Sequence, residues 1–350
     1  MERNEKIMMA SDYQNSAHPA ILAAMAASNE KAMPGYGTDE ICAQAKEHIR
    51  RACDCRHAEV EFLAGGTQAN AVVIGALLKP YQGVIAADSG HVSVHEAGAI
   101  EHTGHKVLLL QGKCGKISAA QIEACMQEYE QDDNHDHIVM PGMVYLSQPT
   151  EFGTLYSRKE LEEISSVCHR YHLPLYVDGA RLAYALAAKV NDVTLPDLAR
   201  LCDVFYIGGT KCGAFIGEAV VIPDPHLIPH FFTIIKQDGA LLAKGWLLGI
   251  QFDELFKDDL YMHIGKTAVQ YAEQIKQELV KDGYSLYFDS PTNQIFFVIA
   301  NDKLETLSQK AVYSYMEKYD ETHAVIRFAT SWSTTKEDVD KLCQIIRETR

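Results

Sequence analysis

The segment DVFYIGGTKCGAFIGEAVVIP, residues 203–223, carries one lysine, Lys211, in a glycine-rich turn between two apolar runs. Short apolar runs bounded by glycine are typical of buried strands. A lysine between two such strands, among the small residues Gly208, Gly209 and Gly213, indicates a crowded and partly dry pocket. Because loss of water disfavours the ammonium form, the amine of Lys211 would be free to react with an aldehyde. The plainer interpretation is a lysine on a surface turn.

The rest of the chain predicts the sheet around this turn. From about residue 60 to residue 223, apolar runs alternate with amphipathic stretches, and the runs are EVEFLA, GVIAAD, KVLLLQ, IVMPGMVYLSQ, PLYVDGA, VFYIGG and EAVVIP. Strands buried on both faces and joined by helical crossovers predict an α/β fold with a mostly parallel sheet covered by helices. After about residue 236, longer helical stretches predict a smaller α+β domain. We expect a large domain with an N-terminal arm over residues 1–240 and a small one over 241–350.

Composition limits the classes of protein that fit. The 350 residues are 47% hydrophobic and 23% charged, which is typical of a folded globular protein with a large core. The formal net charge of −15 leaves no basic surface, so neither nucleic acid nor an anionic membrane is expected as a partner. The N-terminus lacks an apolar leader, and the nine cysteines lack the spacing of a disulfide framework. We expect a cytoplasmic protein.

Small residues follow the first predicted strand. Gly65, Gly66, Thr67 and Gln68 open a predicted helix directly after EVEFLA. Backbone N–H groups at a positive helix end bind anions, and the motif lacks the pattern of a nucleotide-binding loop, so a single phosphate fits best. The alternative is an ordinary glycine turn.

Two further strand ends carry charged residues or histidines. Asp178 ends the strand PLYV, and a buried carboxylate there would need a cation or a protonated ring nitrogen; the alternative is a local ion pair with Arg181. His91 and His95 follow GVIAAD at a spacing that places both on one helix face. No third ligand with suitable spacing is found, so a metal site is not expected. His91 could stack on an aromatic cofactor, or be an ordinary core or surface histidine.

The phosphate site, the strand-end aspartate and the turn lysine, in that order, match the parts that hold pyridoxal 5′-phosphate (PLP), with 33 residues between Asp178 and Lys211. The chain resembles the threonine aldolase branch of the β-eliminating lyase family, among the fold-type I PLP-dependent enzymes. The resemblance extends from SDYQNSAHPAILAAM to VIRFATSW, and VDGARL and GGTK are its most specific pieces.

The resemblance implies a role for each matching residue. Lys211 would bind the aldehyde of PLP, Asp178 would face the ring nitrogen, and His91 would stack on the ring. The remaining cofactor contacts, mainly to the phosphate, would come from Gly66, Thr67, Gln68, Thr210 and Arg181. The substrate carboxylate would be held by Ser11, Arg181 and Arg327.

One segment departs from the family pattern. Several threonine aldolases carry a histidine in a T-H-N-G segment after the fourth strand, where this chain has Thr150-Glu151-Phe152-Gly153. That histidine is a proposed contact to the β-hydroxyl of the substrate. Glu151 and His95 are therefore the candidates for the base that takes the hydroxyl proton.

The implied activity is retro-aldol cleavage of β-hydroxy-α-amino acids of the L-threonine or L-allo-threonine type, which yields glycine and an aldehyde. Two alternatives remain open. One is a PLP-dependent β-elimination in which Lys211 removes the Cα proton, and the other is a non-catalytic protein of the same fold. The resemblance also implies a homodimer or homotetramer with the sites at the subunit interface.

Overall fold

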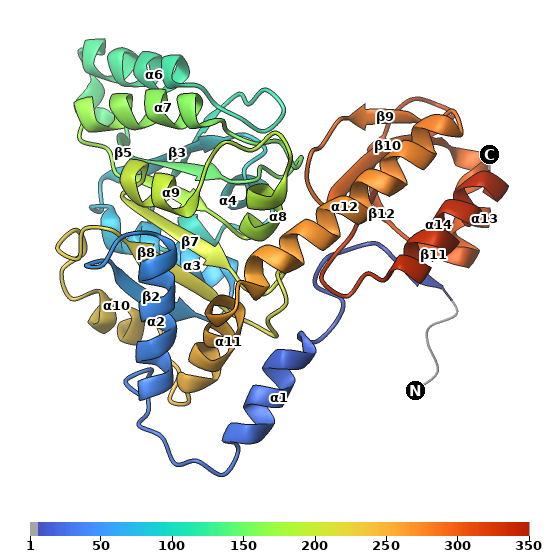
Figure 1. The fold of residues 1–350 in the computed structure, drawn as a ribbon. Coiled ribbons are helices and arrows are strands. Elements are labelled where there is room, and N and C mark those ends of the chain that lie inside the picture. Colours follow the sequence, from blue (N-terminus) through green and yellow to red (C-terminus); the bar gives the residue numbers. More distant parts are fainter. Residues whose placement is uncertain (1–5, 350) are drawn as a thin grey trace.

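The computed structural model of the chain describes residues 6–349, so residues 1–5 and 350 of the two predicted domains lie outside the described residues. Figure 1 shows a large part, in which helices cover a central sheet, and a smaller part built from the C-terminal third of the chain. No helix of the described chain is both long enough and apolar enough to cross a membrane.

Seven strands form the central sheet, in the order β2-β8-β7-β6-β5-β3-β4. They are β2 (Glu59–Leu63), β3 (Gln82–Ala87), β4 (Val107–Leu110), β5 (Met140–Ser147), β6 (Leu175–Asp178), β7 (Val204–Gly208) and β8 (Glu218–Ile222). β8 runs antiparallel to both of its neighbours, β2 and β7, whereas the five strands from β7 to β4 in this order pair in parallel. Each apolar run identified in the sequence forms one of these strands, which confirms the predicted mostly parallel sheet.

Helices cover both faces of this sheet. They are α1 (Pro19–Ser28), α2 (Glu40–Ala52), α3 (Gly66–Leu77), α4 (His91–Val94), α5 (Ala99–His102), α6 (Ala119–Gln131), α7 (Arg158–Arg170), α8 (Leu182–Ala187), α9 (Leu195–Leu201), α10 (Phe231–Gln237), α11 (Trp246–Lys257) and the short 3-10 helix η1 (His135–His137). Apolar side chains of α3, α4, α5 and α10 pack on one face, and those of α2, α6 to α9 and α11 pack on the other.

Local sequence signals explain where several helices begin. Ser118, Ser157 and Thr194 each accept a hydrogen bond from the backbone three residues later, and each forms a reciprocal capping box. Residues 91 to 102 form two short helices, because Ala97 and Gly98 adopt positive φ angles of 52° and 76° between α4 and α5.

The small part is an antiparallel sheet with helices packed on it. Its strands β9 (Ser285–Phe288), β10 (Gln294–Ala300), β12 (Ser314–Lys318) and β13 (His323–Ala329) lie in the order β12-β13-β10-β9. The helices α13 (Asn301–Lys310) and α14 (Lys336–Thr349) pack on it, together with the second half of α12 (Leu260–Lys281). The sequence pattern does not predict β12, because it is a largely exposed edge strand with few apolar residues.

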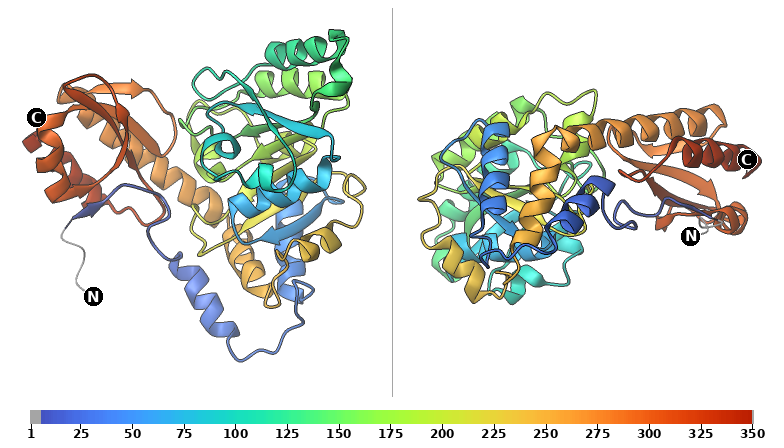
Figure 2. Two further views of the ribbon diagram at one scale, coloured as in Figure 1. Left: turned by 180° about the vertical axis from the view of Figure 1, so that it is seen from behind. Right: turned by 60° about the horizontal axis from the view of Figure 1, so that its bottom comes forward.

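Helix α12 joins the two parts of the molecule. The first half of α12 packs in the core of the large part, and its second half packs in the core of the small part, so the boundary falls within this helix. Both views in Figure 2 show α12 extending from one part into the other. The first described strand, β1 (Ile7–Met8), also lies in the small part, since it pairs in parallel with β11 (Ala311–Val312).

Candidate active site

Asp178 ends β6 near the middle of the large sheet, and only 4% of the residue is exposed. Four donors meet its carboxylate. The hydroxyls of Tyr206 and Tyr145 donate to Oδ1 and Oδ2 at 2.5 and 2.6 Å. The backbone N–H of Ala180 donates to Oδ1 at 2.9 Å, and the amide of Asn70 donates to Oδ2 at 3.2 Å.

These surroundings keep Asp178 ionised. Burial alone would raise the pKa of Asp178, but the charge of His91 and the hydrogen bonds from the tyrosine hydroxyls hold that pKa below its ordinary value. All four hydrogen-bond donors are neutral groups. The negative charge of Asp178 is therefore free to attract a cationic group of a ligand.

A chain of hydrogen bonds leads from Asp178 to His91. The amide of Asn70 that contacts Asp178 also donates to Oε1 of Glu96 at 2.7 Å. Nδ1 of His91 lies 2.7 Å from the same oxygen, and the hydroxyl of Tyr176 donates to Oδ1 of Asn70 at 2.9 Å. Burial alone would lower the pKa of His91, but the hydrogen bond with Glu96 and the nearby acidic side chains raise it above its ordinary value.

Lys211 lies in the turn between β7 and β8, directly after the strand that neighbours β6. The hydroxyl of Tyr184 donates to the backbone oxygen of Lys211 at 2.6 Å. The N–H of Gly208 donates to the backbone oxygen of Gly179 at 3.0 Å, and a Cβ at position 208 would lie 2.3 Å from the backbone oxygen of Ala180. Only glycine fits there, and this close approach brings the two strand ends to one edge of the sheet.

The first turn of α3 lies at the same edge. Its leading N–H groups have no acceptor within the helix, which makes the helix end a suitable place for an anion. A Cβ at Gly66 would lie 3.0 Å from the hydroxyl of Tyr206, so the helix starts against a tyrosine of the aspartate site. Thr67 is exposed, whereas the side chain of Gln68 accepts a hydrogen bond from the N–H of Ala64 at 3.0 Å. The amide oxygen of Gln68 is therefore occupied, and its backbone N–H and side-chain NH2 are the groups that could donate to an anion.

Arg181 pairs with Asp12 rather than with Asp178. Nε and Nη2 of Arg181 donate to the two carboxylate oxygens of Asp12 at 2.7 and 3.1 Å. Both residues are buried, and the amide of Asn293 in the small part also donates to Asp12, at 2.9 Å. The ion pair therefore joins the N-terminal arm, the end of β6 and the small part.

Arg327 extends from β13 of the small part and contacts neutral acceptors. Nη1 donates to the side chain of Gln294 at 2.9 Å, and Nη2 donates to the backbone oxygen of Ala10 at 3.1 Å and to the hydroxyl of Ser314 at 3.2 Å. Its Nε is buried and has no acceptor among residues 6–349. Burial and the charge of Arg181 both lower the pKa of Arg327. A half-buried guanidinium whose acceptors are all neutral favours an anionic ligand.

The two candidate bases lie near His91 but differ in exposure. Glu151, in the loop after β5, is half-buried and lies within electrostatic range of His91, Arg181 and Arg327. His95 is exposed, and its ring centre lies 5.7 Å from that of His91. Because α4 ends at residue 94, the two histidines do not share a regular helix face as their spacing predicted.

Ser11 and Thr210 both stabilise backbone turns at the edge of this group. The hydroxyl of Ser11, which precedes Asp12, accepts a hydrogen bond from the N–H of Tyr13 at 3.2 Å. The hydroxyl of Thr210, which precedes Lys211, accepts one from the N–H of Gly217 at 3.0 Å.

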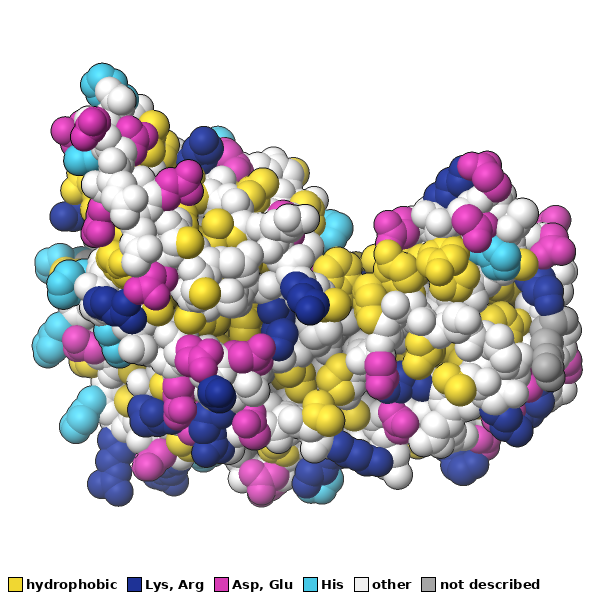
Figure 3. All heavy atoms as spheres, turned by 90° about the horizontal axis from the view of Figure 1, so that it is seen from above, with side chains coloured by type: hydrophobic (Ala, Val, Ile, Leu, Met, Phe, Trp, Pro, Cys, Tyr) yellow, Lys and Arg dark blue, Asp and Glu magenta, His cyan; other side chains and the backbone are white. Residues whose placement is uncertain are grey.

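Figure 3 shows that the surface is hollowed between the two parts of the molecule and that hydrophobic side chains gather there.

Several residues that contact the predicted ones were not identified from the sequence. They are Asp12, Asn70, Glu96, Tyr145, Tyr206 and Glu218. The two tyrosines lie inside apolar runs, where a sequence pattern indicates only core packing. For two of them, only closeness in the sequence to a predicted residue could have indicated a role: Asp12 follows Ser11, and Glu96 lies five residues after His91.

Comparisons with known proteins give the family of the chain. A sequence model described as β-eliminating lyase matches residues 9–292. The low-specificity L-threonine aldolase of Pseudomonas aeruginosa is 33% identical over 97% of this chain and 96% of that protein. A solved threonine aldolase of Leishmania major superposes with a TM-score of 0.94 at 40% identity, covering 97% of this chain and 98% of that one.

A more distant structure bears on the fold alone. An aspartate aminotransferase mutant from Thermus thermophilus superposes with a TM-score of 0.72 at 13% identity, over 99% of this chain and 92% of that one. The predicted fold-type I architecture is thereby confirmed. Since the family model and the full-length relative agree, the chain belongs to the β-eliminating lyase family.

Proposed function

We propose that this protein is a PLP-dependent lyase that cleaves β-hydroxy-α-amino acids, such as L-threonine or L-allo-threonine, to glycine and an aldehyde. One observation carries the proposal: His91 lies within electrostatic range of both Lys211 and the ionised, buried Asp178. A lysine, a histidine and an anionic aspartate are the groups needed to bind and activate a pyridine aldehyde. The full-length relative and the solved structure named as threonine aldolases support the choice of reaction.

The residues at this edge fit PLP. The negative charge of Asp178, whose hydrogen-bond donors are all neutral, suits a protonated ring nitrogen, and the flat ring of His91 suits stacking on the pyridine. The phosphate would be held by Gly66, Thr67, Gln68 and Thr210, through the start of α3 and the turn before Lys211. When bound, PLP supplies an aldehyde that bonds to the amine of Lys211 and a ring that accepts an electron pair.

The substrate carboxylate would bind between the arginines. The charge of Arg181 is already offset by Asp12, whereas Arg327 contacts neutral groups and supplies the unbalanced positive charge. Ser11 would contribute a hydroxyl at the same place. Binding the carboxylate there orients the substrate, so that one chosen bond at Cα is aligned for cleavage.

The β-hydroxyl proton would pass to Glu151, with His95 as the second candidate. Removal of this proton lets the Cα–Cβ bond break, the aldehyde leaves, and protonation of Cα gives glycine. Glu151 is supported by its place near His91 and both arginines, where the substrate carboxylate is expected.

The decisive experiment is a product assay on protein supplied with PLP. A visible absorption band should form, and threonine, allo-threonine or phenylserine should yield glycine and an aldehyde in equal amounts. Ammonia and a 2-oxo acid would instead indicate the alternative β-elimination, with Lys211 removing the Cα proton. Lys211→Ala should lose the visible band, and an unchanged band would contradict the role of Lys211.

We also propose that the protein assembles as a homodimer or homotetramer with its sites at the subunit interface. Phe215 and Ile216 follow Lys211 in the same turn and are 38% and 44% exposed, which supports cover by a second subunit. Light scattering after size exclusion tests this, and a pure monomer would contradict it. All nine cysteines are free thiols, which supports the further proposal of a cytoplasmic location.

A further inference from the structure

Glu218 is a buried carboxyl group that the proposed reaction does not use. It is the first residue of β8, where it pairs with Leu63 on β2 and with Gly208 on β7, and it is 3% exposed. Every second side chain of β8 after it belongs to the apolar cluster that includes Tyr206. Because side chains alternate across a strand, Glu218 lies on the face of the sheet where Tyr206 contacts Asp178.

The carboxyl group contacts the turn that carries Lys211. The N–H of Gly209 donates to Oε2 of Glu218 at 3.1 Å, and the hydroxyl of Thr210 forms a further hydrogen bond with the carboxyl group. The N–H groups of Gly209 and Thr210 also donate to the backbone oxygen of Gly217, at 2.9 and 3.1 Å. Glu218 therefore holds the two residues that immediately precede the lysine.

Both groups that hydrogen-bond Glu218 are neutral, and the charged groups around it oppose one another. The titratable side chains that face it are Lys211 and Cys212 from the turn, Asp178 and Tyr176 from β6, Tyr206 from β7 and Tyr261 from α12. The charge of Lys211 favours ionisation of Glu218, whereas the charge of Asp178 disfavours it.

Burial decides the balance. It raises the pKa of Glu218 to about 8, even though Thr210, Lys211 and Gly209 each act to lower that pKa. The two hydrogen bonds, from the N–H of Gly209 and the hydroxyl of Thr210, both favour the carboxylate form. They are only two, however, whereas the equally buried Asp178 accepts four, so the carboxylate of Glu218 is much less stabilised against burial.

We propose that Glu218 is a positioning residue that remains protonated in the folded protein at neutral pH and, as a neutral acid, holds the Gly209–Thr210 segment beside Lys211. When Glu218 loses its proton in mildly alkaline solution, a negative charge appears next to Lys211. Because Glu218 pairs with Leu63 at the end of β2, this charge also lies near the start of α3. That charge opposes the binding of a phosphate at the helix end. The protonation of Glu218 does not depend on the proposed function, whereas its effect on PLP binding rests on the proposed function.

Infrared spectroscopy of the full-length protein tests for the proton directly. At about pH 6.5 the wild-type protein should show the carbonyl stretch of a protonated carboxylic acid, and this band should disappear by about pH 9.5. Glu218→Gln, which keeps the size of the side chain and mimics the neutral form, should lack the band at both pH values. Absence of the band from the wild-type protein at about pH 6.5 overturns the proposal without any variant.

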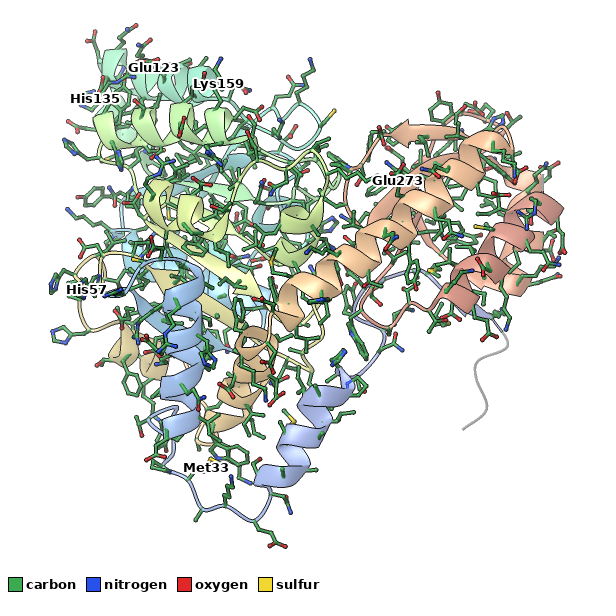
Figure 4. The ribbon with its side chains drawn as sticks, viewed as in Figure 1. Met33, His57, Glu123, His135, Lys159 and Glu273 are labelled. Carbon is green, nitrogen blue, oxygen red and sulfur yellow. The ribbon has the colours of Figure 1, made fainter. Side chains whose placement is uncertain are left out.

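A surface glutamate provides the matched control. Glu163 is 55% exposed on α7, with its Oε1 3.8 Å from Nζ of Lys159, and Figure 4 shows Lys159 on the outer helices of the large part. Glu163→Gln should leave the infrared band and its pH dependence unchanged. If Glu218→Gln does not fold, Glu218→Leu takes its place in the same comparison, and survival of the band in a folded variant assigns it to another residue and overturns the proposal.

The second measurement is the affinity for PLP between about pH 7 and pH 9.5, followed by absorption or fluorescence. We expect the affinity of the wild-type protein, relative to that of Glu218→Gln, to fall several-fold over this range. If the ratio of the two affinities stays constant with pH while the infrared band is present, the proposed effect on PLP binding is wrong and the protonation of Glu218 still holds. Failure of all variants to bind PLP would count against the proposed function, while the infrared result would still decide the state of Glu218.

Discussion

The hydroxyl of Tyr206 donates to Oδ1 of Asp178 at 2.5 Å, and the same hydroxyl would lie 3.0 Å from a Cβ at Gly66. One tyrosine thus connects the strand-end aspartate with the start of the anion-binding helix. Burial raises the pKa of Tyr206 well above its ordinary value, so its hydroxyl remains a proton donor. The position of Asp178 relative to α3 depends on this residue.

Tyr206→Phe should lower the free energy of unfolding by about 1.5–3 kcal/mol, because it removes a hydrogen bond to a buried charge. Tyr176→Phe is the matched control. Its hydroxyl donates to the neutral oxygen of Asn70, so its loss should cost only about 0.5–1.5 kcal/mol. Urea unfolding measures both, and equal losses would contradict the view that the charge of Asp178 strengthens its hydrogen bonds.

Asp12→Ala should be among the most destabilising single changes. It leaves the buried guanidinium of Arg181 without its carboxylate, at a cost of about 3–5 kcal/mol. Asp39→Ala removes an equally buried carboxylate that caps α2 and pairs with no cation among the described residues, and should cost about 0.5–2 kcal/mol. Adding Arg181→Met to Asp12→Ala should recover part of the loss, since the unpaired charge is then gone. No recovery would argue against an uncompensated charge as the cause.

The convergence of Asp178, Lys211 and His91 was predictable because each follows the end of an apolar run, and the carboxyl ends of parallel strands meet at one sheet edge. Apolar periodicity records which residues are buried, but not their partners. The pairing of Asp12 with Arg181, 169 residues apart, and the insertion of β1 beside β11 have no local signal. For the same reason the sequence did not show that α12 is shared between the two parts. Its apolar residues form one continuous stripe, but the first half packs in the core of the large part and the second half in that of the small part.

His91 should titrate above its ordinary pKa of about 6.5 in the wild-type protein, because Glu96 holds its protonated form. NMR of the His91 ring should show the pKa fall in Glu96→Gln and stay unchanged in Glu101→Gln, which alters an exposed residue of α5. A raised pKa means that His91 contributes stability below about pH 6.5 and loses that contribution as pH rises through its folded-state pKa. His91→Asn should therefore flatten the fall in stability over this range, and an unchanged profile would contradict the assignment.

Glu151→Gln should lower the rate of aldehyde formation from threonine by about 10²–10⁴-fold, because the amide cannot accept the hydroxyl proton. The visible band formed with PLP should persist, which separates loss of the base from loss of the cofactor. His95→Gln is the comparison at the second candidate. A small effect at position 151 with a large one at position 95 would reassign the base to the exposed histidine beside His91.

Gly265→Ala tests the junction of the two parts. A Cβ at Gly265 on α12 would lie 2.1 Å from the backbone oxygen of Ala183 on α8, two residues after Arg181, so the helices must separate. We expect a loss of about 1–3 kcal/mol, although alanine is the better helix former. Gly75 is the control, since a Cβ there would meet only Thr103 at 3.8 Å, and Gly75→Ala should stabilise by up to about 1 kcal/mol. Urea unfolding measures both variants. If helix propensity alone decided the outcome, both would be stabilised, whereas close packing of α12 on α8 destabilises Gly265→Ala and leaves Gly75→Ala unaffected.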